Sequence, residues 1–368
     1  MKKILVTGAG GFIGKNLLAA LKERNLQVIT HLHSDAIELL EDKVKNADFI
    51  YHLAGVNRPL KNNEFVTSNI DFTQTLIDCI GKVNKGIAVV YSSSIQAQLD
   101  NPYGQSKRRA EELLAQAEEV GLVKSYIYRL PGVFGKWCRP NYNSVVATFC
   151  HNIINQIPLH IDNPAHQLEL VYIDDVVSAF ISHLSESDSE TGFKKIAVTY
   201  TITLQELADR LQLFHSSRST LVTESVGVGL SRALYATYLS YLDPARFSYS
   251  VPVYKDDRGV FSEILKTPEH GQFSFFTAKP GVTRGGHYHH SKNEKFVVLQ
   301  GKALFKFENI ITGEIYETVK TAVEIEVVET VPGWAHNIKN IGEDDLIVML
   351  WANEIFDRDK PDTFSWSM

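Results

Sequence analysis

The glycine-rich stretch "GAGGFIG" at residues 8–14 constrains the fold more than any other segment. It follows a short β-branched run at residues 3–7 and opens "FIGKNLLAALKERN", whose apolar residues recur at helical spacing. A glycine turn between a strand and a helix lets the backbone approach a pyrophosphate, whose charge then lies at the helix N-terminus. Gly8, Gly11 and Gly14 have this placement, so the sequence predicts a dinucleotide-binding turn. A tight turn without a ligand is the alternative interpretation.

The pattern of predicted secondary structure changes twice after this turn. Strand-like segments alternate with helical patterns up to about residue 140, which predicts a doubly wound parallel sheet covered by helices on both faces. From about 140 to 240 the pattern is mostly helical, with "LVYIDDVVSAFISHLSE" one of the clearest predicted helices, and indicates a small substrate lobe. Beyond "LDPARFSYS", short β-branched and aromatic runs broken by Gly and Pro predict the antiparallel strands of an all-β barrel or sandwich. We therefore expect two domains, residues 1–244 and 245–368.

Composition excludes several classes of protein. Of the 368 residues, 44% are hydrophobic and 22% charged, with a net charge of -6 and no block of like charge, so we expect no nucleic-acid partner. The 3 cysteines lack C-x-x-C spacing, which favours a reducing compartment. The N-terminal apolar run is too short for a signal peptide, and no 18-residue apolar span follows. These features predict a cytoplasmic protein without a membrane partner.

A serine, a tyrosine and a lysine form the first candidate catalytic set. Tyr103 and Lys107 in "YGQSK" stand four residues apart on one helix face, and Ser94 ends the strand-like "VVYSSS". A tyrosine hydroxyl has a pKa of about 10, so it needs a nearby ammonium to act as an acid or base near neutrality. A serine hydroxyl beside it could hydrogen-bond a substrate carbonyl. The three residues together predict proton transfer to or from a carbonyl group.

Three histidines and one glutamate form a candidate metal site in the second domain. His287 and His289 are two residues apart, so a regular strand would point both to one face. Glu294 follows in "SKNEKF", and His336 lies in "PGWAHNIKN". Such a set suits Zn²⁺, Ni²⁺, Mn²⁺ or Fe²⁺. A strand bulge could exchange His290 for His289.

The first 240 residues resemble the extended short-chain dehydrogenase/reductase family, which acts on nucleotide sugars. The resemblance rests on "TGAGGFIG", "HLAG", "YSSS", "YGQSK", "RLPGVFG" and "VYIDDVV". It implies a Rossmann fold and Ser94, Tyr103 and Lys107 as the catalytic set, with Ser93 a neighbouring candidate. It also implies cofactor contacts from Gly8, Gly11, Phe12, Ile13, Gly14, His33, Leu53, Ala54, Tyr103 and Lys107.

The chain departs from this family's pattern at three places. The acidic pair that the family's dehydratases carry after the serine strand is replaced by "SSSIQAQL", which disfavours dehydration. At the end of "QVITHLHS", Leu32, His33 and Ser34 stand where an acidic residue is expected, which leaves no carboxylate for a ribose 2′-hydroxyl and favours NADPH. Gly132 stands where many relatives have Asn.

Residues 245–368 resemble the cupins, which are jelly-roll barrels, and more narrowly the 4-keto-sugar nucleotide 3,5-epimerases. The narrower likeness lies in "DDRGVFSEI" and "RGGHYH". It implies that Arg258, Phe261 and Glu263 hold the nucleotide, while Arg284 and His287 flank the ketosugar with His287 as base. Those epimerases generally use a metal-free histidine, so the base role of His287 conflicts with its ligand role. We give the ligand role precedence.

The whole chain resembles capsular polysaccharide synthesis enzymes in which a reductase is fused to a cupin. The resemblance implies that the cupin epimerises a UDP-4-keto-6-deoxy-hexosamine at C3. The reductase then reduces the C4 ketone with NADPH to a UDP-6-deoxy-talose-type sugar of the UDP-N-acetyl-L-6-deoxytalosamine class. It also implies bound Zn and a homodimer or larger homo-oligomer. A cupin that only senses metal or sugar, and a non-haem iron oxygenase, are the alternatives.

Overall fold

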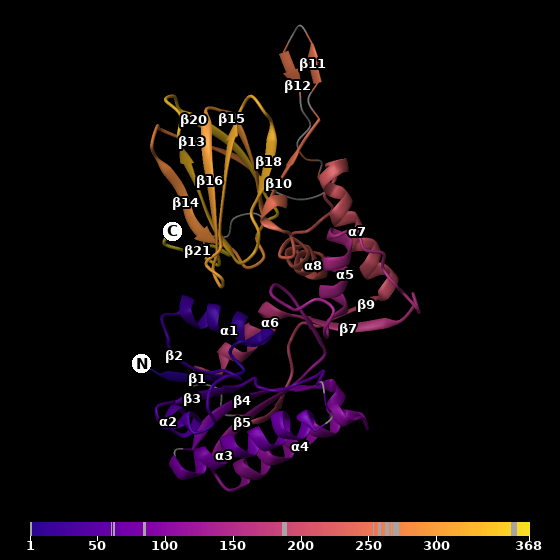
Figure 1. The fold of residues 1–368 in the computed structure, drawn as a ribbon, viewed down its shortest axis with the longest axis vertical. Coiled ribbons are helices and arrows are strands. Elements are labelled where there is room, and N and C mark those ends of the chain that lie inside the picture. Colours follow the sequence, from indigo (N-terminus) through magenta and orange to yellow (C-terminus); the bar gives the residue numbers. More distant parts are fainter. Residues whose placement is uncertain are drawn as a thin grey trace. The chain divides into compact units, whose positions relative to one another are not determined.

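The computed structural model describes most of the chain as two compact units (Figure 1). The described residues are 2–59, 61, 63–83, 86–185, 190–252, 254–256, 259–261, 265, 267, 272–354 and 359–368, without the side chains of 254–256, 259–261 and 272–274. One unit comprises Met1–Ser144 and Leu168–Ile202, and the other Val145–Gln167 and Thr203–Met368. No helix among the described residues is long and apolar enough to cross a bilayer.

The first unit is built on a six-stranded parallel sheet of order β2-β1-β3-β4-β5-β8. Its strands are β1 (Lys3–Thr7), β2 (Gln27–His31), β3 (Phe49–His52), β4 (Ile87–Ser94), β5 (Val123–Leu130) and β8 (Gly192–Lys194). Both faces are covered, as Figure 1 shows, with α2, α3 and α4 on one side and α1 and α6 on the other. These helices are α1 (Phe12–Glu23), α2 (Leu39–Lys45), α3 (Phe72–Val83), α4 (Pro102–Glu119) and α6 (Ile173–Ser182). The doubly wound prediction is confirmed.

Apolar side chains of the sheet and of α2, α3 and α4 form the core between the sheet and these helices. Leu5, Ile50 and Val89 of the sheet are fully buried against Leu76 of α3 and Leu114 of α4. Strands buried on both faces read as continuous apolar runs, which is why "KILV" and "IAVV" contain so few polar residues.

A small sheet interrupts the region that was expected to be mostly helical. Strands β6 (Gly132–Phe134), β7 (Gln167–Tyr172) and β9 (Tyr200–Thr203) pair in the order β6-β7-β9. The prediction of one helix over "LVYIDDVVSAFISHLSE" is therefore wrong at its start, because its first residues end β7 and α6 begins at Ile173. Val171 and Tyr172 pair with β6, and this parallel pairing outweighs the helical spacing.

The second unit combines three helices with an antiparallel barrel. The helices are α5 (Val145–Ile154), α7 (Leu204–Thr220) and α8 (Gly229–Leu239). One barrel sheet has the order β10-β18-β15-β20-β13 and the other has the order β17-β16-β19-β14-β21. Strands β11 and β12 form a separate two-stranded hairpin. The barrel strands are β10 (Ser248–Ser250), β13 (Gln272–Ala278), β14 (Thr283–Tyr288), β15 (Glu294–Gln300), β16 (Lys302–Asn309), β17 (Ile315–Thr321), β18 (Glu326–Glu329), β19 (Trp334–Asn340), β20 (Leu346–Ala352) and β21 (Phe364–Ser365), and the hairpin pairs β11 (Tyr254–Asp256) with β12 (Gly259–Phe261). The predicted jelly-roll cupin is confirmed.

The boundary expected between residues 244 and 245 falls inside a short 3₁₀ turn, Pro244–Arg246, just before β10. The compact units divide the chain differently, because α5, α7 and α8 group with the barrel. The two-domain boundary therefore stays a prediction.

A buried ion network joins α7 to the barrel within this second unit. Glu329 of β18 accepts hydrogen bonds from Lys295 of β15 and, at 2.5 Å, from Arg218 of α7. Lys295 also donates to the Tyr249 hydroxyl at 3.0 Å. Burial acts to lower the pKa of Lys295, but the negative charge of Glu329 outweighs it and holds the pKa well above its ordinary value. Each charge in the network therefore depends on the others.

We predict that Glu329→Ala destabilises the protein by about 3–5 kcal/mol, because it leaves the buried ammonium of Lys295 unpaired. The double variant Lys295→Met with Glu329→Leu should recover part of this loss, since the two most deeply buried charges are gone and only Arg218, which also donates to the Arg246 carbonyl, loses a partner. Urea unfolding measures both effects. A single variant as stable as the wild-type protein would contradict the proposed dependence.

Candidate active site and candidate metal centre

The glycine turn after β1 is too tight to admit side chains. A Cβ on Gly14 would lie 2.4 Å from the carbonyl oxygen of Gly8, and one on Gly8, whose φ is +67°, would lie 2.6 Å from the backbone nitrogen of Ala54. Gly11 is the N-cap of α1 and, lacking a side chain, makes no side-chain hydrogen bond to the first-turn N–H groups of the helix. These groups, which include those of Phe12 and Ile13, could hold a phosphate.

Hydrogen bonds tie the ends of β1 and β3 together beside this turn. The Thr7 hydroxyl lies 2.8 Å from Nδ1 of His52 and accepts from the Ala54 N–H at 3.4 Å, while Leu53 donates to the Thr7 carbonyl at 3.3 Å. Burial, with a smaller contribution from the charge of Lys107, lowers the pKa of His52 to about 3. A neutral buried imidazole therefore fixes the Thr7 side chain, which holds the backbone beside the glycine turn.

The structure separates the roles of Ser93 and Ser94 at the end of β4. The Ser93 hydroxyl donates to the buried carboxylate of Glu111, which also binds Arg129 through contacts of 2.6 and 3.0 Å. The Ser94 hydroxyl accepts from the Gln96 N–H at 3.2 Å and hydrogen-bonds Tyr103. Ser94, rather than Ser93, is therefore the serine that the fold brings to the tyrosine.

Helix α4 presents Tyr103 and Lys107 from its first turns. The Lys107 ammonium donates to the Ser92 carbonyl at 2.9 Å and the Tyr91 hydroxyl at 3.3 Å. Burial lowers the pKa of Lys107 to about 8, although the charge of Glu111 opposes this shift. Burial raises the pKa of Tyr103, and the Ser94 hydrogen bond only partly offsets it. Tyr103 is therefore protonated near neutrality and could donate a proton.

The loop after β2 differs from the sequence expectation. His33, a predicted cofactor contact, lies in an exposed turn. Two residues later, the Asp35 carboxylate accepts from the Leu32 N–H at 3.0 Å and pairs with Lys43 at 2.6 Å, and the Lys43 hydrogen bond lowers its pKa. A turn thus places one carboxylate near the end of β2, where Lys43 and the Leu32 N–H engage it, and the expected preference for NADPH stays a prediction.

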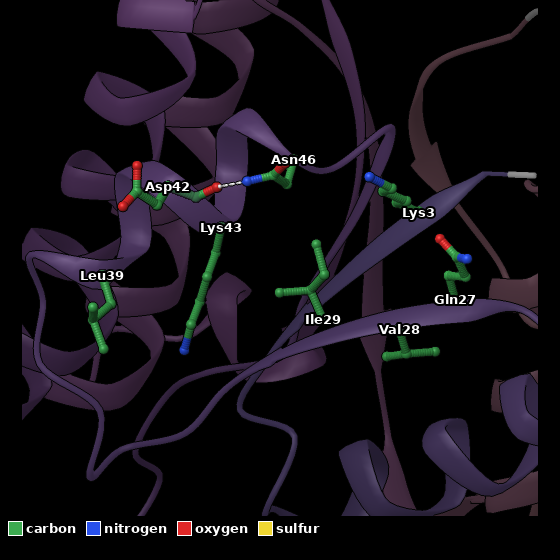
Figure 2. Close-up of a pocket in the computed structure, with 8 residues that line it drawn as sticks. All are labelled: Lys3, Gln27, Val28, Ile29, Leu39, Asp42, Lys43 and Asn46. Atoms are coloured by element: carbon green, nitrogen blue, oxygen red, sulfur yellow. Dashed lines mark hydrogen bonds between the residues drawn. The ribbon is translucent and has the colours of Figure 1, made fainter.

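Figure 2 shows a surface pocket that is lined by residues of β1, β2 and α2. Its lining includes Lys3 and Gln27, the first residues of β1 and β2, and Asp42 and Lys43 of α2. The glycine turn follows the opposite, carboxyl end of β1. Ligands of doubly wound sheets bind at the carboxyl ends of strands, so this pocket is not the predicted cofactor site.

The four predicted metal ligands lie together inside the barrel. His287 of β14 pairs directly opposite His336 of β19. The ligand atoms of His287, His289, Glu294 and His336 all lie within 4.8 Å of one another. One Glu294 oxygen is 3.2 Å from Nε2 of His289 and 3.4 Å from Nε2 of His336. The fold thus assembles the set, and metal binding stays a prediction.

The histidines reach this cluster by a different route from the regular strand that was expected. A register shift between Gly285 and His287 bulges β14, and Gly285 and Gly286 have φ of +102° and +77°. His289 lies in the turn beyond the strand. The His290 ring packs against Phe364 with centroids 4.9 Å apart, so the fold selects His289 for the cluster.

The protonation states of the cluster suit a divalent metal. Burial acts to raise the pKa of Glu294, but hydrogen bonds with His289 and His336 outweigh it and leave the carboxylate ionised. Burial and neighbouring histidines lower the pKa of His287 to about 3, and burial lowers that of His336. Metal ions bind carboxylates and neutral imidazoles. The Lys292 ammonium lies 2.9 Å from the second Glu294 oxygen, which leaves one oxygen for an ion.

The predicted substrate-binding residues are only partly described. Arg284 is exposed on β14, where it donates to the Thr277 carbonyl at 3.4 Å and lies over the Phe276 ring. Phe261 lies in β12, but its side chain is outside the described residues, as are Arg258 and Glu263. Their nucleotide-binding role stays a prediction.

Comparison with known proteins agrees with this geometry. Residues 4–198, more than half of the chain, match the NAD dependent epimerase/dehydratase family. The chain belongs to this family. Residues 254–364 match the polysaccharide biosynthesis C-terminal domain.

Two family members are similar over their whole length. The UDP-2-acetamido-2,6-beta-L-arabino-hexul-4-ose reductase of Pseudomonas aeruginosa is 53% identical over 368 residues, which cover 100% of this chain and 99% of that protein. The crystal structure of the capsular polysaccharide assembling protein CapF from Staphylococcus aureus is 39% identical, with a TM-score of 0.68 and 100% of both chains covered. The dTDP-4-dehydro-6-deoxyglucose reductase of Escherichia coli is 24% identical over 260 residues, which cover 57% of this chain and 80% of that protein. The resemblance to a reductase fused to a cupin is confirmed.

Three buried polar residues of this family member were missed by the sequence analysis. Glu111 stands four residues after Lys107 on the same helix face, a spacing that indicates interaction. Lys292 stands two residues before Glu294, in the turn that was read only for its ligands. Asn69, in a π-helical turn (Val66–Asp71), bonds both Val56 and Ser106, and its sequence carries no signal for this link.

We predict that His336→Ala weakens divalent-metal binding at least about 10-fold, because one of the clustered ligands is lost. The thermal stabilisation that added Zn²⁺ gives should fall with it. Metal content by mass spectrometry and thermal unfolding with and without Zn²⁺ measure these effects. His290→Ala is the matched control and should keep its metal, since His290 lies outside the cluster. Equal losses in both variants would contradict the ligand set.

Proposed function

We propose that this chain reduces the C4 ketone of a UDP-linked 4-keto-6-deoxy-hexosamine with NADPH. The proposal rests chiefly on the 53% identity, over the full length, to a protein named as a reductase of a UDP-linked hexul-4-ose sugar. The hydrogen bond between Ser94 and Tyr103 at the carboxyl edge of the sheet supports it. So does the name of the E. coli relative, which also reduces a nucleotide-linked 4-dehydro sugar.

The described residues account for the proton in this reduction. When bound, the nicotinamide supplies a hydride to C4. Ser94 would hydrogen-bond the ketone oxygen and align it with the Tyr103 hydroxyl, whose raised pKa keeps the proton available. Tyr103 gives this proton to the oxygen as C4 is reduced, and solvent restores it. The Lys107 ammonium, one helical turn away, favours the transient tyrosinate.

We further propose that the barrel epimerises the same sugar at C3 before reduction, giving a UDP-6-deoxy-talose-type product of the N-acetyl-L-6-deoxytalosamine class. The C4 ketone acidifies the C3 hydrogen, so a base can remove it and a proton can return to the other face. A divalent ion, Zn²⁺ by preference, held by the four clustered ligands would stabilise the enolate. Because His287 lies in the ligand cluster, it serves as base only if it does not bind the ion.

A second candidate is a reductase whose barrel senses metal or sugar without catalysis. The name of the P. aeruginosa relative favours it, since that name specifies reduction alone. An iron-dependent oxygenase is a third prediction, which oxygen consumption would test. We also propose that the chain forms a homodimer or larger homo-oligomer, which light scattering after gel filtration tests.

One experiment separates the first two candidates. The protein is incubated in D₂O with a UDP-4-keto-6-deoxy-hexosamine, with and without NADPH, and the products are followed by NMR. Deuterium at C3 without NADPH indicates epimerisation, while reduction without any deuterium at C3 indicates a sensing barrel. A parallel incubation with NADH tests the proposed preference for NADPH. Failure to reduce the sugar with either cofactor overturns the proposed function.

We predict that Tyr103→Phe abolishes oxidation of NADPH but leaves deuterium exchange at C3 intact, because the phenol supplies a proton only in the reduction. Both rates can be followed in the D₂O incubation described above. Loss of exchange together with reduction would show that the two reactions share one site.

We predict that the reduction rate falls as the pH rises through about 8, because the Lys107 ammonium, whose pKa burial lowers to about 8, loses its proton there. The same shift makes the folded state bind fewer protons than the unfolded state above pH 8, so this group stabilises the fold as the pH rises and unfolding does not explain the fall.

Two glutamates provide a matched comparison for this pH dependence. Glu111→Gln removes a negative charge that raises the pKa of Lys107, so the fall should move to lower pH. Glu112→Gln removes an exposed charge paired with Arg109 and should leave the profile unchanged. The pH profile of kcat/KM measures both, and coincident profiles for the two variants would contradict the role of Lys107.

A further inference from the structure

Asp362, two residues before β21, binds the turn that carries two of the candidate metal ligands. Its carboxylate accepts hydrogen bonds from the backbone N–H groups of His290 at 2.8 Å, Ser291 at 2.7 Å and Lys292 at 2.7 Å, and from the Ser291 hydroxyl at 2.9 Å. Consecutive N–H groups that converge on one anion fix the conformation of a turn. This turn runs from His289 to Glu294, so its conformation sets the distance between two ligands.

The backbone of the same residue orients the His289 ring. Nδ1 of His289 contacts the main-chain carbonyl of Asp362, which can only accept a hydrogen bond. Nδ1 therefore carries a proton, and Nε2 is the nitrogen that faces the cluster, 3.2 Å from a Glu294 oxygen. Such partners of the second imidazole nitrogen fix the tautomer and direction of metal-binding histidines.

Helix α8 contacts Asp362 through an ion pair with Arg232. The Arg232 guanidinium of α8 lies 3.6 Å from the Asp362 carboxylate and 3.1 Å from that of Glu354, which follows β20. All of these groups belong to the second compact unit. The ligand turn and α8 are therefore linked through one carboxylate.

A second link joins the same two segments. The Asn353 side chain accepts from the Asn293 N–H at 2.9 Å and donates to the Val226 carbonyl at 3.2 Å, just before α8. Both asparagines are buried. The approach is close, because a Cβ on Gly227 would lie 2.7 Å from the Asn353 carbonyl oxygen. A shift of α8 would thus act on both ends of the ligand turn.

We propose that Asp362, held by Arg232, is a positioning residue that sets the conformation and tautomer of His289 and thereby couples metal binding in the barrel to helix α8. The inference rests on the proposed metal site. It adds to that site a specific link to the helical segment that the sequence analysis predicted to be a substrate lobe.

The variants Asp362→Asn and Arg232→Met test the positioning role. Asp362→Asn keeps the main-chain carbonyl and the shape of the side chain, but replaces one acceptor oxygen by a donor that faces backbone N–H groups. Arg232→Met keeps the apolar stem and removes the guanidinium. Glu308→Gln is the control for loss of a negative charge, because the new amide oxygen can still accept from Trp366 of the same C-terminal segment.

Affinity for Zn²⁺ is measured by competition with a chromophoric chelator, and the site geometry by the absorption spectrum of bound Co²⁺. Asp362→Asn should weaken Zn²⁺ binding about 10–100-fold and alter the Co²⁺ spectrum. Arg232→Met should act in the same direction by a smaller factor, and the double variant should be no worse than Asp362→Asn, since both act through one carboxylate. Glu308→Gln should match the wild-type protein.

Each other outcome has a defined meaning. Weaker binding with an unchanged Co²⁺ spectrum would reduce Asp362 to a distant charge and overturn the positioning role, as would wild-type affinity in both variants. A wild-type protein that binds neither metal overturns the metal site and this inference together. If Asp362→Asn does not fold, hydrogen exchange of the wild-type protein decides: added Zn²⁺ should slow exchange in residues 289–293 and in α8, and an unaffected α8 overturns the coupling.

Discussion

A buried carboxylate is tolerated only when opposite charges or N–H donors surround it, and this constraint organises both halves of the molecule. Glu111 is satisfied by Ser93 and Arg129. Glu329 is satisfied by Lys295 and Arg218, and Glu294 by two histidines and Lys292. In each case the partners come from different strands, helices or turns, so satisfying the charge also fixes how those elements meet.

The constraint has a direct consequence for the candidate active site of the first unit. Because Glu111 engages Ser93, only Ser94 is left to meet Tyr103. The same carboxylate lies one turn from Lys107 and opposes the effect of burial on its pKa. One structural ion pair therefore both selects the serine and supports the charge of the lysine. Tyr103, Lys107 and Glu111 follow one another at intervals of four residues on α4, so one helix keeps the spacing of the candidate catalytic pair and its electrostatic support rigid.

Local patterns predicted the fold and most of the candidate site residues. The glycine turn, the spacing of Tyr103 and Lys107, and the histidine pair are short-range signals, and the structure places each of them on the predicted type of domain. The features that local patterns do not reveal arise where the chain folds back on itself. Asp35 returns to the end of β2 through a turn, and the bulge at Gly285 replaces regular alternation. Asp362 reaches the ligand turn from 73 residues away, a contact that no local pattern encodes.

The proposed chemistry explains why one chain would carry both domains. The C3 hydrogen is acidic only while C4 is a ketone, so reduction ends epimerisation and fixes the configuration at C3. A reductase that acted too early would trap the unepimerised sugar. An enzyme that holds both activities therefore benefits when the epimerase site influences binding of the sugar for reduction. Helix α8 is suited to this, because it groups with the barrel that carries the candidate metal ligands while lying in the segment predicted to form the reductase's substrate lobe. The proposed link through Asp362 would let the state of the candidate metal site act on this helix.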